Sequence, residues 1–162
     1  MKVLGIDPGF GRMGWAIVEI AGSGVRAIEF GCVETKSVMS FAERLLVLSD
    51  ELRRLIKKFH PEVVAVEELF FAKNVKTAIQ VAHGRGVIIL AAAQAGLPIV
   101  EVKPAEVKQT IAGNGNADKK QVQKMVQIIF GLKAPLKSDD AADALAVALT
   151  GGSRARWEKK TK

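Results

Sequence analysis

The chain has 162 residues, enough for one domain that buries roughly 70% of the surface of its unfolded form. Apolar residues make up 49% and charged residues 25%, a balance that is ordinary for a globular protein and excludes a disordered or fibrous chain. The longest apolar stretch, residues 87–100, falls short of the roughly 20 residues that a membrane span needs, so we expect no membrane partner. Cys32 has no second cysteine to pair with and lies in an apolar setting, so we expect it in the core. No secretory signal opens the chain, which favours a cytoplasmic location.

The formal net charge of +7 is unevenly distributed. Five basic residues and one acidic residue follow Thr150, so this segment carries +4 and the rest of the chain only +3. A basic end of this kind is usually a solvated tail. We therefore predict one domain over residues 1–150 and a basic, disordered tail over residues 151–162. The charge alone indicates a nucleic-acid partner only weakly.

The first part of the chain has the composition of β-strands. Segments rich in β-branched and aromatic residues alternate with glycine-containing turns, which predicts three antiparallel strands in a meander. The strands are expected at residues 2–7, 15–20 and 25–34, with turns at residues 8–11 and 22–24.

Helices and two further strands follow. Ser40 and Glu43 form a capping box at the start of an amphipathic helix that ends before Pro61. The apolar run 63–67 is typical of a strand covered on both faces. The order predicts an α/β fold with a five-stranded mixed sheet, three antiparallel strands and then two parallel ones, flanked by helices. The other elements are helices over residues 75–95, 105–112, 118–130 and 138–150 and a strand over residues 99–102.

Four acidic residues lie at positions where apolar ones are expected. Asp7 and Glu67 each end an apolar strand, and Asp140 and Asp143 lie among alanines in the last helix. Carboxylates are rarely buried unless they are paired or bind a metal. If the first and fourth strands are parallel neighbours, Asp7 and Glu67 meet at the carboxyl edge of the sheet. The spacing of three places Asp140 and Asp143 on one helix face, so we predict one shared cation site.

The ligands of this site are all oxygens. His60 and His83 are isolated, and no His/Cys cluster has the spacing of zinc ligands. Oxygen ligands suit Mg²⁺ or Mn²⁺, and four carboxylates are enough for two ions about 4 Å apart. Each acid alone has an ordinary explanation, such as a turn, a strand end or a favourable helix dipole. The combination of all four with the predicted topology favours a metal site.

Residues 9–14 match the dinucleotide-binding pattern G-x-G-x-x-G. That pattern requires a helix after the third glycine, whereas Gly14 leads into a segment with the composition of a strand followed by a hairpin turn. We therefore predict no dinucleotide site. The glycines are expected to turn the chain sharply and to leave room near Asp7 for a phosphate.

Four short motifs occur in the order of a known family. They are GIDPG at residues 5–9, AVEELF at residues 65–70, VKQT at residues 107–110 and DAADALA at residues 140–146. Together they resemble the bacterial RuvC family of Holliday-junction resolvases, over residues 1 to about 150. The resemblance implies a ribonuclease-H-like fold, a homodimer, and Mg²⁺-dependent hydrolysis with water as the nucleophile, with Mn²⁺ as a substitute. It also implies paired symmetric nicks in four-way junction DNA during recombination and repair, and the RuvA and RuvB branch-migration complex as a partner.

The resemblance assigns roles by position. Asp7, Glu67, Asp140 and Asp143 match the catalytic and metal-binding acids, although the acid at Asp140 varies to His in parts of the family. Glu67 is preferred to Glu68, which we expect on the other face of the sheet.

The expected DNA contacts lie in a loop and around a glycine-rich turn. Phe70 matches a family aromatic residue that stacks on an unpaired base, with the choice between it and Phe71 left open. The other expected residues are Lys73 in the same loop, Lys108, Lys119 and Lys120 for phosphates, and Arg85 in the helix that the family uses for its dimer interface.

Three other functions are compatible with parts of this pattern. An actin-like ATPase also begins with a strand, Asp-x-Gly and a hairpin, but it needs a second lobe for which the chain is too short. A DNA-binding module without catalysis would be unaffected by Asp7→Asn. A related ribonuclease-H-like nuclease with another substrate would not require the loop that carries Phe70.

Overall fold

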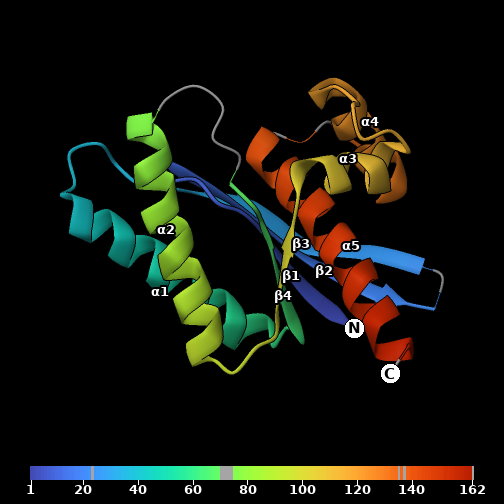
Figure 1. Ribbon diagram of the computed structural model, residues 1–162, viewed down its shortest axis with the longest axis horizontal. Coiled ribbons are helices and arrows are strands. Elements are labelled where there is room, and N and C mark those ends of the chain that lie inside the picture. Colours follow the sequence, from blue (N-terminus) through green and yellow to red (C-terminus); the bar gives the residue numbers. More distant parts are fainter. Residues whose placement is uncertain (23, 70–74, 135, 137, 162) are drawn as a thin grey trace.

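The computed structural model describes residues 1–22, 24–69, 75–134, 136 and 138–161. A five-stranded sheet forms its centre, with helices on both faces (Figure 1). No helix in these ranges is long and apolar enough to cross a membrane. The elements are β1 (Lys2–Asp7), β2 (Arg12–Ala21), β3 (Gly24–Glu34), α1 (Phe41–Phe59), β4 (Val63–Glu67), α2 (Val75–Gln94), β5 (Ile99–Val102), α3 (Pro104–Ala112), α4 (Lys119–Ile129) and α5 (Asp139–Lys160).

The sheet has the predicted mixed topology. Its strand order is β3-β2-β1-β4-β5, with β1 antiparallel to β2, β2 antiparallel to β3, and β4 parallel to both β1 and β5. The two parallel strands are reached through the helical connections α1 and α2. The predicted order of elements is therefore confirmed.

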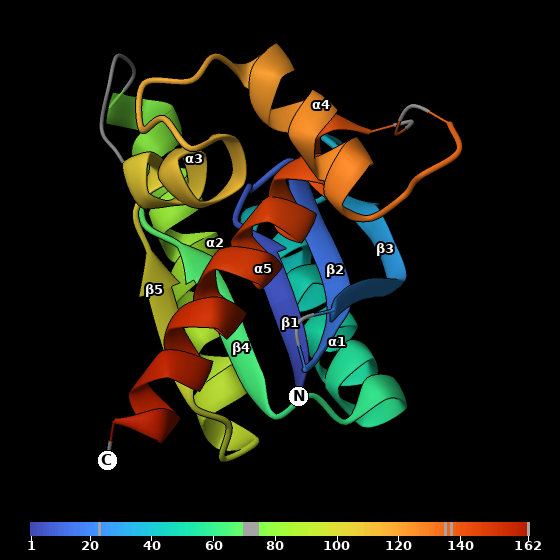
Figure 2. The ribbon, with the colours of Figure 1, turned by 90° about the vertical axis from the view of Figure 1, so that its right-hand side faces the viewer.

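Each face of the sheet has its own hydrophobic core. Because successive side chains of a strand point to opposite faces, Val3 of β1 packs toward α5 while Leu4 and Ile6 pack toward α1 and α2. α5 lies across one face, next to α3 and α4, and the pair α1 and α2 covers the other (Figure 2). The strand ends that carry the predicted acids are thus held between two packed layers.

Glycine allows α5 to approach the sheet closely. A Cβ atom at Gly5, in the middle of β1, would lie 2.4 Å from the carbonyl oxygen of Ala144 and 2.6 Å from the backbone nitrogen of Ala148. No side chain fits in this space, and the small residues of α5 complete the contact. This approach brings the first turn of α5 to the edge where β1 ends.

The last helix is longer than predicted. α5 continues past Thr150 to Lys160, so the prediction of a disordered tail from residue 151 is wrong for the described residues up to 160. Two adjacent glycines are poor helix formers, but here they pack on the sheet: a Cβ at Gly151 would lie 2.4 Å from that of Ala65, and one at Gly152 would lie 2.6 Å from Ile20 Cδ1. Tertiary packing therefore outweighs the low helix propensity.

Candidate active site

Two acidic residues end neighbouring parallel strands. β1 and β4 pair in register, so Asp7 and Glu67 lie side by side at the carboxyl edge of the sheet. We refer to Asp7, Glu67, Asp140 and Asp143 as the acidic cluster. The pKa of Asp7 rises from 3.8 to about 8, mainly because the carboxyl is buried and then because the other three acids carry like charges nearby. The pKa of Glu67 rises from 4.5 to about 7, through burial and then the charge of Asp143.

The structure thus places all four predicted acids in one electrostatic environment. Glu68, the alternative to Glu67, lines a separate polar cavity of about 520 Å³ that also contains Glu101 and Arg154. Residues of α3 and α5 also line this cavity, so the expectation that Glu68 lies on the other face of the sheet stays a prediction.

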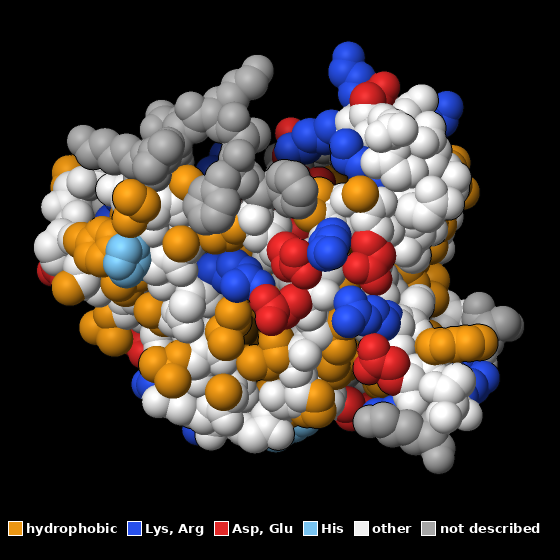
Figure 3. Space-filling model, viewed as in Figure 1, with side chains coloured by type: hydrophobic (Ala, Val, Ile, Leu, Met, Phe, Trp, Pro, Cys, Tyr) orange, Lys and Arg blue, Asp and Glu red, His pale blue; other side chains and the backbone are white. Residues whose placement is uncertain are grey.

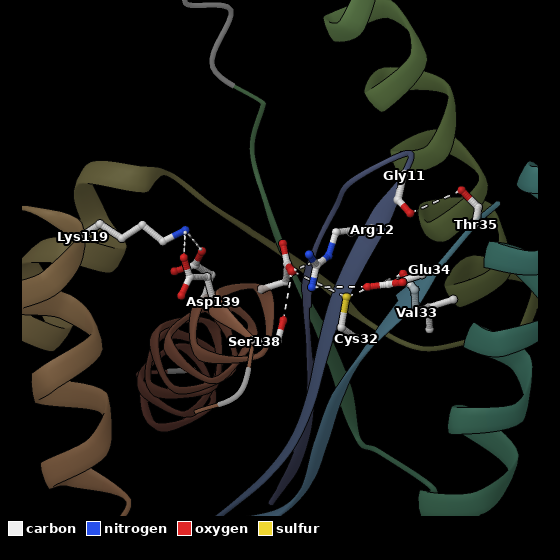
Figure 4. A network of polar contacts seen from close by, with 11 residues as sticks. Gly11, Arg12, Cys32, Val33, Glu34, Thr35, Lys119, Ser138 and Asp139 are labelled. Carbon is white, nitrogen blue, oxygen red and sulfur yellow. Dashed lines mark hydrogen bonds and ion pairs between the residues drawn. The ribbon is translucent and has the colours of Figure 1, made fainter. Parts of the chain in front are cut away.

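Asp143 is paired with a lysine from α4. Lys119 Nζ lies 3.2 Å from Asp143 Oδ2 and 3.4 Å from Asp139 Oδ2 (Figure 4). The position of Lys119 is fixed by the start of α4, where Asp118 and Gln121 form a complete capping box. Burial raises the pKa of Asp143, and the nearby ammonium of Lys119 opposes that rise. A residue predicted as a DNA contact is therefore also part of the acidic site.

Asp140 is held from three sides. Arg12 Nε lies 3.0 Å from Asp140 Oδ2, and the Ser138 hydroxyl donates to the same oxygen at 3.0 Å. The Cys32 thiol, whose pKa burial raises, donates to it at 3.6 Å. Arg12 and Cys32 come from β2 and β3 and point toward the start of α5 (Figure 4). The expectation that Cys32 is a core residue is thus wrong, because the thiol is only half-buried and contacts this acid.

The glycines after β1 turn the chain sharply, as predicted, and they do so against the protein's own main chain. A Cβ at Gly9 would lie 1.8 Å from the carbonyl oxygen of Arg12, and a Cβ at Gly14 would lie 2.0 Å from that of Asp140. The space at these two positions is filled by the protein's own main chain and is not open to a phosphate. Gly14 lies within β2, so the helix that a dinucleotide site requires after its third glycine does not begin there.

The remaining predicted contacts are distributed around the acidic cluster. Lys108 of α3 lies close enough to Glu67 to lower its pKa against the effect of burial. Lys120 lines a cavity of about 240 Å³ between α4 and the start of α5. Phe70, Phe71 and Lys73 lie outside the described residues.

Arg85 of α2 supports the end of β4. Its Nε donates to the Glu67 carbonyl at 3.1 Å, its guanidinium pairs with Glu101 of β5, and the side chain is only 17% exposed. Acidic and basic side chains interleave over the middle of the face seen in Figure 3, and Arg154 continues this pattern by pairing with Glu106 and Glu158. Arg85 is thus engaged within its own chain, and its role in a dimer stays a prediction.

The acidic cluster has the donor chemistry of a hard divalent cation. Its candidate ligands are carboxylate oxygens. The pKa values of Asp7 and Glu67 are raised first by burial and then by neighbouring negative charge, which a cation would compensate. Across the described ranges, no three acidic, His or Cys side chains lie close enough together to bind one ion as they stand. As they stand, Asp140 is paired with Arg12 and Asp143 with Lys119. The residues fit Mg²⁺ or Mn²⁺ by their chemistry, and two of the four carboxylates are balanced by the protein's own cations.

Arg12, Cys32 and Ser138 were not predicted as site residues. Arg12 directly follows the glycine turn, and Ser138 stands two residues before Asp140. Their closeness in the sequence to the predicted turn and to a predicted acid was the only feature that could have identified them. The contact between Cys32 and Asp140 joins residues 108 positions apart and has no local signature.

Comparison with known proteins identifies the family to which this chain is similar. The family model described as "Crossover junction endodeoxyribonuclease RuvC" matches residues 3–151. A protein of that name from Roseiflexus sp. (strain RS-1) is 51% identical over 148 residues, which cover 91% of this chain and 88% of the relative. Another, from Moorella thermoacetica, is 48% identical over 162 residues, which cover 100% of this chain and 97% of the relative.

A solved structure of Thermus thermophilus RuvC in complex with a Holliday junction substrate matches with a TM-score of 0.92 at 37% identity, over 98% of this chain and 96% of that one. The resemblance seen in the four motifs and the ribonuclease-H-like fold that it implied are both confirmed. This chain belongs to the RuvC family of crossover junction endodeoxyribonucleases.

Proposed function

We propose that this chain is the endonuclease that resolves Holliday junctions, cutting phosphodiester bonds of four-way junction DNA in recombination and repair. The observation that carries the proposal is the convergence of the acidic cluster, from β1, β4 and α5, at one edge of the sheet. Membership of the RuvC family supports the junction as the substrate.

Mg²⁺ is the proposed cofactor, with two ions in each site and Mn²⁺ as a substitute. Asp7, Glu67, Asp140 and Asp143 would hold the ions. When bound, such ions lower the pKa of a water nucleophile and stabilise the charge that develops on the phosphate and the leaving oxygen. Asp7 and Glu67 bring buried carboxylates of high pKa, so protons and metal ions compete for the same oxygens.

The lysines around the acidic cluster are proposed to bind the DNA backbone. Lys119 and Lys108 lie near enough to alter the pKa values of Asp7 and Glu67, so a phosphate that reaches these acids also meets ammonium groups. Lys120, which follows Lys119 at the start of α4, extends this basic edge. Phe70 and Lys73 complete the proposed DNA contacts.

A homodimer is proposed to make the two symmetric nicks. Leu45, Ile79, Val87 and Leu90 of α1 and α2 line a shallow apolar groove, where Ile79 is 52% exposed and Leu90 57% exposed. Apolar side chains gather on this side of the molecule, left of centre in Figure 3. An exposed apolar surface of this kind is typical of a protein interface, and a second copy of α2 is its proposed occupant.

The proposed setting is the cytoplasm, with the RuvA and RuvB branch-migration complex as a partner and no role for a membrane. RuvA and RuvB are proposed on the basis of the family alone.

The test is incubation of the protein with a synthetic four-way junction and a matched linear duplex, with and without Mg²⁺. We expect symmetric nicks in the junction alone, and only with metal. Asp7→Asn should keep junction binding and abolish cleavage. Equal cutting of both substrates would point to a general nuclease, and unimpaired cutting by Asp7→Asn would remove the acidic cluster from the chemistry.

A further inference from the structure

All three groups that hold Asp140 contact the same oxygen. Arg12 Nε at 3.0 Å, the Ser138 hydroxyl at 3.0 Å and the Cys32 thiol at 3.6 Å all meet Oδ2. Among the described residues, no hydrogen bond is formed to Oδ1, and the ion pair with Arg12 is made through Oδ2. The carboxylate is therefore fixed through one oxygen, and the other is left available as a ligand.

Arg12 is itself held in place. It is the first residue of β2, and its second contact joins Nη2 to Glu34 Oε1, at the end of β3, over 3.4 Å. The guanidinium thus bridges Glu34 and Asp140, and its planar shape makes a two-sided contact that the flexible ammonium of lysine does not reproduce. Gly14, two residues further along β2, lets the main chain of Asp140 come close enough for this contact.

Ser138 does not make the hydrogen bond that is usual for a serine at its position. It is the N-cap residue of α5, where a serine side chain normally accepts a hydrogen bond from the helix backbone. Here its side chain makes no capping bond and its hydroxyl donates to Asp140. A local stabilising contact has been replaced by one that orients an acidic side chain.

We propose that Arg12 is a positioning residue, which fixes Oδ2 of Asp140 so that Oδ1 serves as a metal ligand. This inference rests on the proposed metal-dependent nuclease function. Arg12 contacts Asp140 through an ion pair. Partners that contact a metal ligand in this way orient it, and their loss typically costs about 10- to 100-fold in metal affinity. Arg12 contacts neither the DNA nor the ion in this role.

The competing explanation is that Arg12 merely occupies the carboxylate until a metal ion displaces it. The two explanations predict opposite effects of Arg12→Gln on metal binding. Loss of an orienting contact weakens binding, whereas loss of a competing cation strengthens it, because the site becomes more negative.

The experiment is titration of the DNA-free protein with Mn²⁺, followed by calorimetry and by electron paramagnetic resonance. We expect Arg12→Gln to raise the Kd for Mn²⁺ roughly 10-fold and Arg12→Lys to recover part of the loss. Arg26→Gln is the matched control, because Arg26 lies in β3 and pairs with Glu19 of β2, away from the acidic cluster. An unchanged or lower Kd in Arg12→Gln would overturn the proposal.

Two further variants address the same oxygen without removing a charge. Ser138→Ala and Cys32→Ala should each raise the Kd for Mn²⁺ by a smaller factor than Arg12→Gln does. In a separate double variant, Arg12→Gln should not change the Kd further when the protein already carries Asp140→Asn. Additive effects in that double variant would contradict a role through Asp140. Thermal unfolding in EDTA and junction binding in Ca²⁺ identify any variant whose fold is damaged. If Arg12→Gln is such a variant, the Kd values of Ser138→Ala and Cys32→Ala test the proposal in its place.

The outcomes separate this inference from the proposed function. The metal-dependent function itself fails if the unaltered protein binds no Mn²⁺, or if its Mn²⁺ binding is the same in Asp7→Asn. If the unaltered protein binds Mn²⁺ and cuts junctions while Arg12→Gln binds Mn²⁺ equally well, only the positioning role of Arg12 fails.

Discussion

Gly14 of β2 lies directly against the main chain of Asp140 at the start of α5, where a Cβ atom would come within 2.0 Å of the carbonyl oxygen. Gly14 is also the residue opposite Asp7 in the antiparallel pairing of β1 and β2. One glycine therefore sets the distance between two segments that supply acids of the site.

Replacing Gly14 with alanine should push the start of α5 away from the sheet. We expect the rate of junction cleavage to fall at least tenfold and the protein to lose about 1–3 kcal/mol of stability, the usual cost of overpacking. Gly24→Ala is the control, because its Cβ would meet only an ordinary contact at 3.5 Å. Cleavage kinetics and thermal unfolding measure the two effects, and a wild-type rate in Gly14→Ala would show that this spacing does not matter.

The stability of the metal-free protein should depend on Asp7 and pH. The pKa of Asp7 in the folded protein is about 8, well above its ordinary value of 3.8, so the folded state binds a proton that the unfolded state releases between these values. The stability due to the protonated carboxyl is full below the ordinary pKa and is lost as the pH rises through 8. In EDTA, Asp7→Asn should therefore melt several degrees above the unaltered protein at pH 9 and close to it at pH 4. Thermal scans across this range would contradict the argument if the difference did not grow with pH.

Loss of Lys119 should affect both the DNA and the acids. Lys119→Gln removes an ammonium group that pairs with Asp143 and Asp139 and that is available to phosphate. We expect weaker junction binding and a smaller salt dependence, by about one unit in the slope of log K against log salt. Lys57→Gln, on the exposed side of α1, is the control. An unchanged slope would mean that Lys119 serves only to balance the acids.

The apolar groove predicts the behaviour of a dimer variant. Leu90→Lys places a charge in the groove, so the protein should become monomeric in analytical ultracentrifugation, and the two nicks in a junction should lose their coupling. Leu46→Lys alters a residue of α1 that is equally exposed but does not line the groove. A Leu90→Lys protein that stays dimeric would place the interface elsewhere.

The sequence was sufficient to predict the order of the sheet and the approach of the four acids to one another in the fold. Asp7 and Glu67 could be placed because each ends an apolar strand, and the order of strands and helices left one edge where they meet. Asp140 and Asp143 followed from their spacing within a helix. These inferences use local patterns and the handedness of connections, which a single sequence contains.

The contacts around Asp140 could not be predicted in the same way. Cys32 and Asp140 come together only through the packing of β2, β3 and α5, and Cys32 has no feature that separates it from a buried thiol. The continuation of α5 through Gly151 and Gly152 was missed for a related reason. Two glycines argue for a helix end unless a sheet surface lies within contact distance, and that surface is formed by distant residues such as Ala65 and Ile20.

The hydrogen bond from Arg85 to the Glu67 carbonyl joins α2 to the carboxyl end of β4. Arg85 belongs to α2, the helix proposed to meet its copy across the dimer, and Glu67 is one of the proposed metal ligands. A displacement of α2 at the interface would pull on the main chain of Glu67 in the same protomer. If the proposed dimer forms through α2, this hydrogen bond is a direct connection from the interface to the acidic cluster of the same protomer.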